Sequence, residues 1–330
     1  CVQSPDPMPG HNELNERQGL AEIATTFMRC HLRNDPITCL QVSCEECQQE
    51  AWSRFLVKNI DGVADSDPVE DPDEEEEEPG TGIGGGASSR VELPIESLYS
   101  ATGTALTGTL SVEGYEIFYP DPLVGPHPVI TWGNATGGTP QLYQILLDHF
   151  ASWGFIVVAT TNTICSGDDL TGGVDLLSAM NDDPESIFHN QVDLGTVGAS
   201  GHSLGAACAI TAGTVDSRIR SVVVGNPAPG DSSATDVSLL IMGAEGDPIV
   251  RPAAIETIYD DSAMTPTIAG IISGGNHFLY MGNGGPFRGY ATAWFMTELL
   301  NDTEAAAAFY GDCEICDHPE WISLERKGIE

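Results

Sequence analysis

From about residue 91 onward, the sequence alternates short, almost wholly apolar runs with segments of helical periodicity. Uninterrupted apolar runs are typical of strands that are buried on both faces, as in a parallel sheet covered by helices. Parallel neighbours need a long crossover, which a helix usually provides. We therefore expect residues 91–330 to form one α/β domain, with a mostly parallel central sheet flanked by helices.

The pattern gives approximate bounds for these elements. The expected strands cover residues 115–119, 128–132, 155–160, 196–200, 219–224, 237–242 and 267–272. The expected helices cover residues 141–153, 174–180, 204–213, 252–259 and 290–300. No segment repeats another along the chain, so a single continuous domain is expected.

The first ninety residues have a different composition. Residues 1–60 carry two short helical patterns and four closely spaced cysteines, Cys30, Cys39, Cys44 and Cys47. They predict a small Cys-rich helical segment stapled by disulfides, with a zinc site as the alternative. Residues 61–90 are acidic and then Gly-rich, and include five consecutive glutamates. Such a composition predicts a disordered linker.

The charge balance excludes several classes of partner. The chain of 330 residues has 12 Lys and Arg against 49 Asp and Glu, for a net charge of −37. A polyanion of this size is repelled by nucleic acid and by anionic lipid, so no nucleic-acid partner is expected. No apolar run approaches the roughly 18 residues that a membrane-spanning helix needs.

The cysteines indicate an exported protein. A chain that begins at Cys1 and continues into a polar, Pro-rich stretch resembles a processed bacterial lipoprotein, and an arbitrary boundary is the alternative. The resemblance implies a secreted or cell-envelope protein whose contact with a membrane, in particular an outer membrane, is a lipid on Cys1. The other eight cysteines are an even number, as disulfides require. We expect Cys313 and Cys316 to form a structural disulfide, whereas Cys165 and Cys208 either pair or remain buried thiols.

The most informative motif is Gly201-His202-Ser203-Leu204-Gly205, between an expected strand and an expected helix. A serine in a sharp strand-to-helix turn is lifted above the edge of the sheet, and flanking glycines let the two elements pass closely. The motif therefore predicts Ser203 as a nucleophile.

A nucleophilic serine needs a base, and the base needs an acid that orients it. In this strand–turn–helix context, the acid and then the histidine follow in loops after later strands. Asp247 follows the strand expected at 237–242, with Glu245 as its competitor, and His277 follows the strand expected at 267–272. We predict Ser203, Asp247 and His277 as the catalytic residues.

A tetrahedral intermediate needs two amide donors for its oxyanion. The amide of Leu204, next to the nucleophile, is one candidate. The other lies in the Gly-rich loop after the strand expected at 128–132, where Asn134 or Ala135 supplies it.

Taken together, these motifs resemble the α/β-hydrolases of the cutinase and bacterial polyester hydrolase type, including poly(ethylene terephthalate) hydrolases. The resemblance extends over residues 115–316. The matching pieces are Gly133-Asn134, Gly154-Phe155, Gly201 to Gly205, Gly243 to Asp247, Asn276-His277-Phe278, Tyr290 to Trp294 and Asn301-Asp302-Thr303. The resemblance implies a shallow cleft that cleaves ester bonds in polymers, the triad Ser203, Asp247 and His277, and oxyanion donors at Asn134 and Leu204.

The chain departs from that family in ways that bear on its substrate. The family usually has an aromatic residue where Asn134 stands and a methionine where Leu204 stands. The loop 225–230 lacks the family's tryptophan, which stacks on aromatic polymers, so we expect aliphatic or short-chain esters as substrates. The residues predicted to border the cleft are Trp132, Thr136, His202, Ala228 and Phe278. Trp132 or Phe278 would replace the missing aromatic, with a place in the core as the alternative for either.

The function expected is that of an exported, monomeric serine carboxylic-ester hydrolase with an acyl-enzyme mechanism, which needs neither a metal nor a cofactor. A small-ester hydrolase resembling dienelactone hydrolases or chlorophyllases is one alternative. The other is a tethered module that only binds a surface, against which the complete order of the triad argues.

Overall fold

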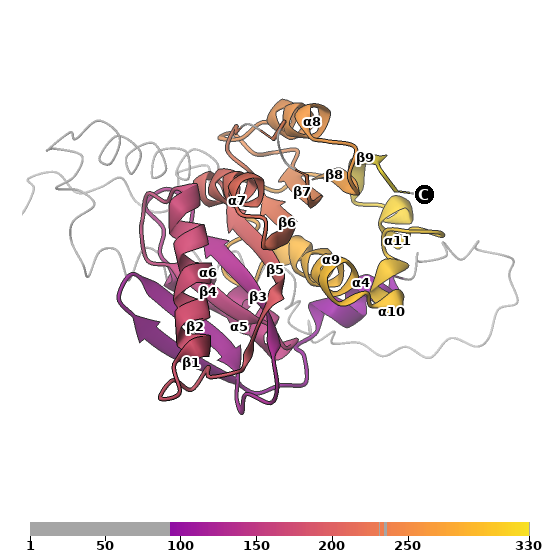
Figure 1. Ribbon diagram of the computed structural model, residues 1–330. Coiled ribbons are helices and arrows are strands. Elements are labelled where there is room, and N and C mark those ends of the chain that lie inside the picture. The colour runs from indigo at the N-terminus through magenta and orange to yellow at the C-terminus, as the bar shows by residue number, and fades with distance from the viewer. Residues whose placement is uncertain (1–92, 231, 234–235, 330) are drawn as a thin grey trace, which may run out of the picture. The chain divides into compact units, whose positions relative to one another are not determined.

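The structure is a computed structural model that describes residues 93–230, 232–233 and 236–329 (Figure 1). The predicted Cys-rich segment, the predicted linker and Cys1 lie outside the described residues. Predictions about them stay predictions.

The domain is built on a nine-stranded mixed sheet with the order β1-β2-β4-β3-β5-β6-β7-β8-β9. The strands are β1 (Thr107–Val112), β2 (Tyr115–Pro120), β3 (His127–Gly133), β4 (Ile156–Thr160), β5 (Val192–His202), β6 (Ile219–Gly225), β7 (Ser238–Ala244), β8 (Thr267–Ile272) and β9 (Trp321–Lys327). Strands β3 to β8 pair in parallel, whereas β1, β2 and β9 pair antiparallel at the two edges. The α/β fold class and the mostly parallel sheet are confirmed.

Helices cover both faces of this sheet (Figure 1). The α-helices are α4 (Pro94–Ser100), α5 (Gln144–Ser152), α6 (Gly167–Asp182), α7 (Leu204–Val215), α8 (Pro252–Asp261), α9 (Arg288–Leu300), α10 (Thr303–Ala306) and α11 (Glu314–Asp317), and two 3₁₀ turns are η2 (Pro140–Tyr143) and η3 (Gly285–Phe287). One apolar core forms beneath α5 and α9, and a second forms beneath α6, α7 and α8. The loops at the carboxyl ends of the parallel strands are therefore carried on a sheet that is fixed from both sides.

The helix expected at 174–180 begins earlier than predicted. The prediction missed its first turns because they contain residues that favour other structures. Helix α6 starts at Gly167, where Ser166 and Asp169 form a capping box. It continues through Gly172 and Gly173, and a Cβ at Gly173 would lie 3.2 Å from atoms of Tyr115 and Val158. Small residues allow this helix to lie close to the sheet, although their intrinsic helix propensity is low.

Two disulfides are present among the described residues. Cys313 and Cys316 form one, as predicted, and Cys165 and Cys208 form the other, which resolves the alternative that the sequence left open. Within the described ranges, no helix is both long enough and apolar enough to cross a bilayer.

A buried histidine makes the stability of this domain depend on pH. His149 lies in α5, and its Nε2 is 3.0 Å from both the carbonyl oxygen of Tyr99 and Oγ1 of Thr292. Burial, together with the charge of Arg288, lowers the pKa of His149 to about 4. The unfolded chain takes up a proton near pH 6.5 that the folded chain does not, so stability is lost as the pH falls from about 6.5 to 4.

We predict that the substitution His149→Gln weakens this pH dependence. The wild-type free energy of unfolding should lose about 2.5 kcal/mol through this group between pH 7.5 and 4.5. Glutamine keeps an N–H donor but does not titrate, so the variant should lose less by roughly that amount. Urea unfolding at the two pH values measures the difference. Equal losses in both proteins would contradict the assignment.

Candidate active site

The strand-to-helix turn after β5 holds Ser203 in an unusual backbone conformation. Its φ is +56° and its ψ is −117°, a combination that costs roughly 1–3 kcal/mol and persists only where the surroundings impose it. The Ser203 amide donates to the carbonyl of Gly225 at 3.2 Å, and the Ala228 amide donates to the carbonyl of Ser203 at 2.9 Å. The loop after β6 therefore holds the serine on both sides.

The glycines around Ser203 are required by close backbone contacts. A Cβ at Gly201 would lie 2.3 Å from the carbonyl oxygen of Gly205. A Cβ at Gly205 would lie 2.0 Å from the carbonyl oxygen of Gly133. No side chain fits at either distance. Glycine is therefore required at both positions for α7 to lie this close to β5 and to the end of β3.

Ser203, His277 and Asp247 lie in one hydrogen-bonded line at the carboxyl end of the sheet. Oγ of Ser203 is 2.9 Å from Nε2 of His277, and Nδ1 of His277 is 2.7 Å from Oδ2 of Asp247. Because a carboxylate only accepts, Nδ1 carries the proton and Nε2 is left to accept the proton of the serine hydroxyl. The imidazole is thus in the tautomer that a general base needs.

Both oxygens of the Asp247 carboxylate accept two hydrogen bonds each. Its Oδ1 accepts hydrogen bonds from the amides of Ile249 at 2.8 Å and Val250 at 2.9 Å. Its Oδ2 accepts from Nδ2 of Asn226 at 2.9 Å as well as from His277. Asn226 is fully buried directly after β6, and sequence analysis did not single it out. The signal available was its position at the carboxyl end of a parallel strand.

The competing acid, Glu245, has other partners. Its Oε2 accepts from the amide of Gly274 at 3.0 Å and lies 3.4 Å from Oγ of Ser273. Glu245 is exposed, whereas only 3% of Asp247 is exposed. The geometry therefore favours Asp247 as the residue that orients His277.

The two amides proposed as oxyanion donors face different constraints. Leu204 is the first residue of α7, so its amide has no acceptor within the helix. The amide of Ala135 already donates to the hydroxyl of Tyr143 at 3.2 Å. Within the described ranges, the amides of Asn134 and Leu204 donate to no other protein group. These contacts favour Asn134 over Ala135.

His202 lies beneath the site and not in the cleft, so that prediction was wrong. It is fully buried; its Nε2 donates to the carbonyl of His277 at 2.6 Å, and its Nδ1 lies 2.9 Å from the hydroxyl of Tyr143. Burial, together with the nearby His277, lowers the pKa of His202 well below its ordinary value. A neutral His202 thus joins the backbone of His277, through the hydroxyl of Tyr143, to the amide of Ala135.

Trp132 is also wrongly predicted as a cleft residue. Its side chain is fully buried against Tyr143 and Tyr280, with ring centroids 5.0 and 5.7 Å apart, and its Nε1 donates to Oδ1 of Asn134 at 3.1 Å. The alternation of side chains along β3 directs Trp132 into the core.

The other three residues predicted to border the cleft are partly exposed. Thr136 lies in the loop after β3 and Ala228 in the loop after β6, and the ring of Phe278 lies 5.6 Å from that of His277, centroid to centroid. Their contact with substrate stays a prediction.

Across the described residues, no group of three or more metal-ligating side chains comes together.

We predict that Asp247→Asn lowers the ester-hydrolysis rate by roughly 10⁴-fold, because an amide favours the wrong tautomer of His277. Glu245→Gln, the matched control two residues away, should leave the rate within about twofold, since its carboxylate does not reach the imidazole. Initial rates with a p-nitrophenyl ester measure both. Should the two effects be reversed, Glu245 would be the orienting acid.

The chain is similar to a known protein family over the region that contains this site. A family model described as PET hydrolase-like matches residues 99–319, which is well over half of the chain. The matched range contains the turn at Ser203 and the loops that carry Asn134, Asp247 and His277. None of the curated proteins searched matches the chain.

Proposed function

Because the chain belongs to the PET hydrolase-like family of the α/β-hydrolase superfamily, we propose that it is a serine carboxylic-ester hydrolase with an acyl-enzyme mechanism. Family membership supports ester or polyester hydrolysis as the class of activity. The observation that carries the serine mechanism is the hydrogen-bonded line from Ser203 through His277 to Asp247.

In the first half-reaction, Oγ of Ser203 attacks the ester carbonyl while Nε2 of His277 accepts its proton. The oxyanion that forms accepts hydrogen bonds from the amides of Asn134 and Leu204. His277 then returns the proton to the leaving alcohol, and Asp247 stabilises the imidazolium while that proton is held. An acyl group remains on Ser203.

In the second half-reaction, water replaces the alcohol. His277 takes a proton from the water, which attacks the acyl carbon, and the same two amides stabilise the second oxyanion. The carboxylic acid leaves when the proton returns to Oγ of Ser203. Since no step changes an oxidation state, the proposed reaction requires only substrate and water.

The substrate proposed is an aliphatic polyester or a short-chain ester. In the loop after β6, Ala228, Pro229 and Gly230 lie where the family usually presents a stacking tryptophan. Trp132 is buried in the core and offers no ring to a substrate, which leaves the half-buried Phe278 as the aromatic side chain beside the base. A stacking aromatic contributes about 1 kcal/mol beyond the area it buries.

Export to an oxidising compartment is supported by the two disulfides, which are rare in proteins of reducing compartments. The lipid on Cys1 and the monomeric state stay predictions. The family match favours a polyester hydrolase over the alternatives related to dienelactone hydrolases and chlorophyllases.

We predict that Ser203→Ala abolishes hydrolysis of p-nitrophenyl butyrate, with a loss of about 10⁴- to 10⁶-fold in kcat. Alanine removes the attacking oxygen and adds no bulk to the turn. Near-UV circular dichroism should show an unchanged fold. A folded variant with near wild-type activity would exclude the serine mechanism.

We also predict a preference for aliphatic polymer. Films of polycaprolactone and of amorphous poly(ethylene terephthalate) with equal area should release more product from the former, measured by chromatography of the soluble products. Faster release from the aromatic film would contradict the prediction. If Phe278→Ala then removed that preference, Phe278 would be the stacking residue.

A further inference from the structure

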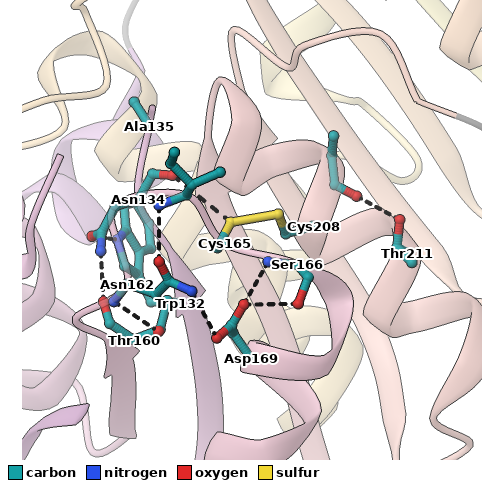
Figure 2. Close-up of a disulfide and its surroundings, with 12 residues drawn as sticks. Trp132, Asn134, Ala135, Thr160, Asn162, Cys165, Ser166, Asp169, Cys208 and Thr211 are labelled. Carbon is teal, nitrogen blue, oxygen red and sulfur yellow. Dashed lines mark hydrogen bonds between the residues drawn. A yellow bond between two sulfur atoms is a disulfide. The ribbon is translucent and has the colours of Figure 1, made fainter. Parts of the chain in front are cut away.

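The disulfide between Cys165 and Cys208 joins the loop after β4 to helix α7, beside the turn that carries Asn134 (Figure 2). Both cysteines are nearly buried, with 7% and 5% of their surface exposed. Sγ of Cys165 lies 4.0 Å from the carbonyl oxygen of Asn134. A covalent bond between distant segments therefore passes next to one proposed oxyanion donor and ends in the helix that begins with the other.

The turn that carries Asn134 is attached to the same loop by hydrogen bonds. Nδ2 of Asn134 donates to the carbonyl of Thr160 at 2.6 Å, and the amide of Gly137 donates to the carbonyl of Thr163 at 2.7 Å. Oδ1 of Asn134 accepts from Trp132, so both ends of this buried side chain are engaged. The position of the turn thus depends on the position of the loop that contains Cys165.

The loop is ordered from its other end by the start of α6 (Figure 2). Oδ2 of Asp169 accepts from the amide and the hydroxyl of Ser166 at 2.6 and 2.8 Å, and Oδ1 of Asp169 accepts from Asn162 at 3.2 Å. These bonds hold the loop to α6. The disulfide holds it to α7, 43 residues further along the chain.

We propose that the Cys165–Cys208 disulfide is a positioning element of the oxyanion hole, which holds the amide of Asn134 at a set distance from the amide of Leu204. This inference rests on the proposed function. Its chemical basis is that two donors stabilise one developing charge only when both lie at hydrogen-bond distance from it. A misplacement of about 1 Å can cost on the order of 10²-fold in rate.

The test compares two variants that each remove one disulfide. Cys165→Ala/Cys208→Ala removes the proposed positioning element, and Cys313→Ala/Cys316→Ala is the matched control at α11. With p-nitrophenyl butyrate, kcat should fall by about tenfold or more in the first variant, while KM stays within about twofold, because the transition state is affected more than substrate binding. The control should keep both constants within about twofold.

A second measurement separates positioning from simple stabilisation. In the phosphonylation of Ser203 by a p-nitrophenyl phosphonate, negative charge builds up on the phosphoryl oxygen in the same hole, so the rate should fall in parallel with kcat. The melting temperature is recorded for each variant, and assays are made well below it. A lowered melting temperature with unchanged kcat and phosphonylation rate would overturn the proposal.

The single variant Cys208→Ala breaks the bond but keeps the sulfur of Cys165 in place, and it gives the same test if the double variant does not fold. A loss of kcat in it supports the proposal, and wild-type kcat overturns it. Failure of the proposed function has a different signature. In that case the wild-type protein would not hydrolyse the ester, or Ser203→Ala would hydrolyse it equally well.

Discussion

The whole site depends on the contact between two backbones, at Gly205 in the first turn of α7 and at Gly133 at the end of β3. With no Cβ on either residue, the helix that follows Ser203 can lie directly against the turn that carries Asn134. This contact brings the backbone at the start of α7, next to Leu204, against the backbone of Gly133 and Asn134. A larger residue at either glycine would separate the two segments that carry the proposed oxyanion donors.

Around this contact, polar side chains replace apolar packing at the carboxyl ends of the central strands. Asn226, His202 and Asn134 are all fully buried, and a side-chain nitrogen of each donates a hydrogen bond to a distant segment, at Asp247, His277 and Thr160 respectively. A buried polar group without a partner is costly, so each of them favours one arrangement of the loops it joins. The arrangement is therefore specified by hydrogen bonds as well as by the apolar cores on the two faces of the sheet.

Much of the site could be predicted from the sequence because its signals are local. The glycines around Ser203, together with an apolar run before and a small-residue helix after, predict the turn without knowledge of the rest of the chain. Asp247 and His277 follow strands that are recognisable by their apolar character, and parallel strands bring their carboxyl ends to one edge. Edge strands β1 and β9 gave no such signal, because no residue of β1 and only Trp321 of β9 is buried and their sequences mix polar and apolar residues.

The sequence by itself determined the order of strands and helices from β2 to α9, the turn at Ser203 and the candidates for nucleophile, base and acid, because each follows from a pattern within a few residues. Tertiary structure alone decided which side chains point into the site. It placed Trp132 and His202 in the interior, gave Asp247 the contact with His277 and Glu245 other partners, and joined Cys165 to Cys208. These outcomes depend on distances between segments that lie far apart in the chain, and no local pattern encodes such distances.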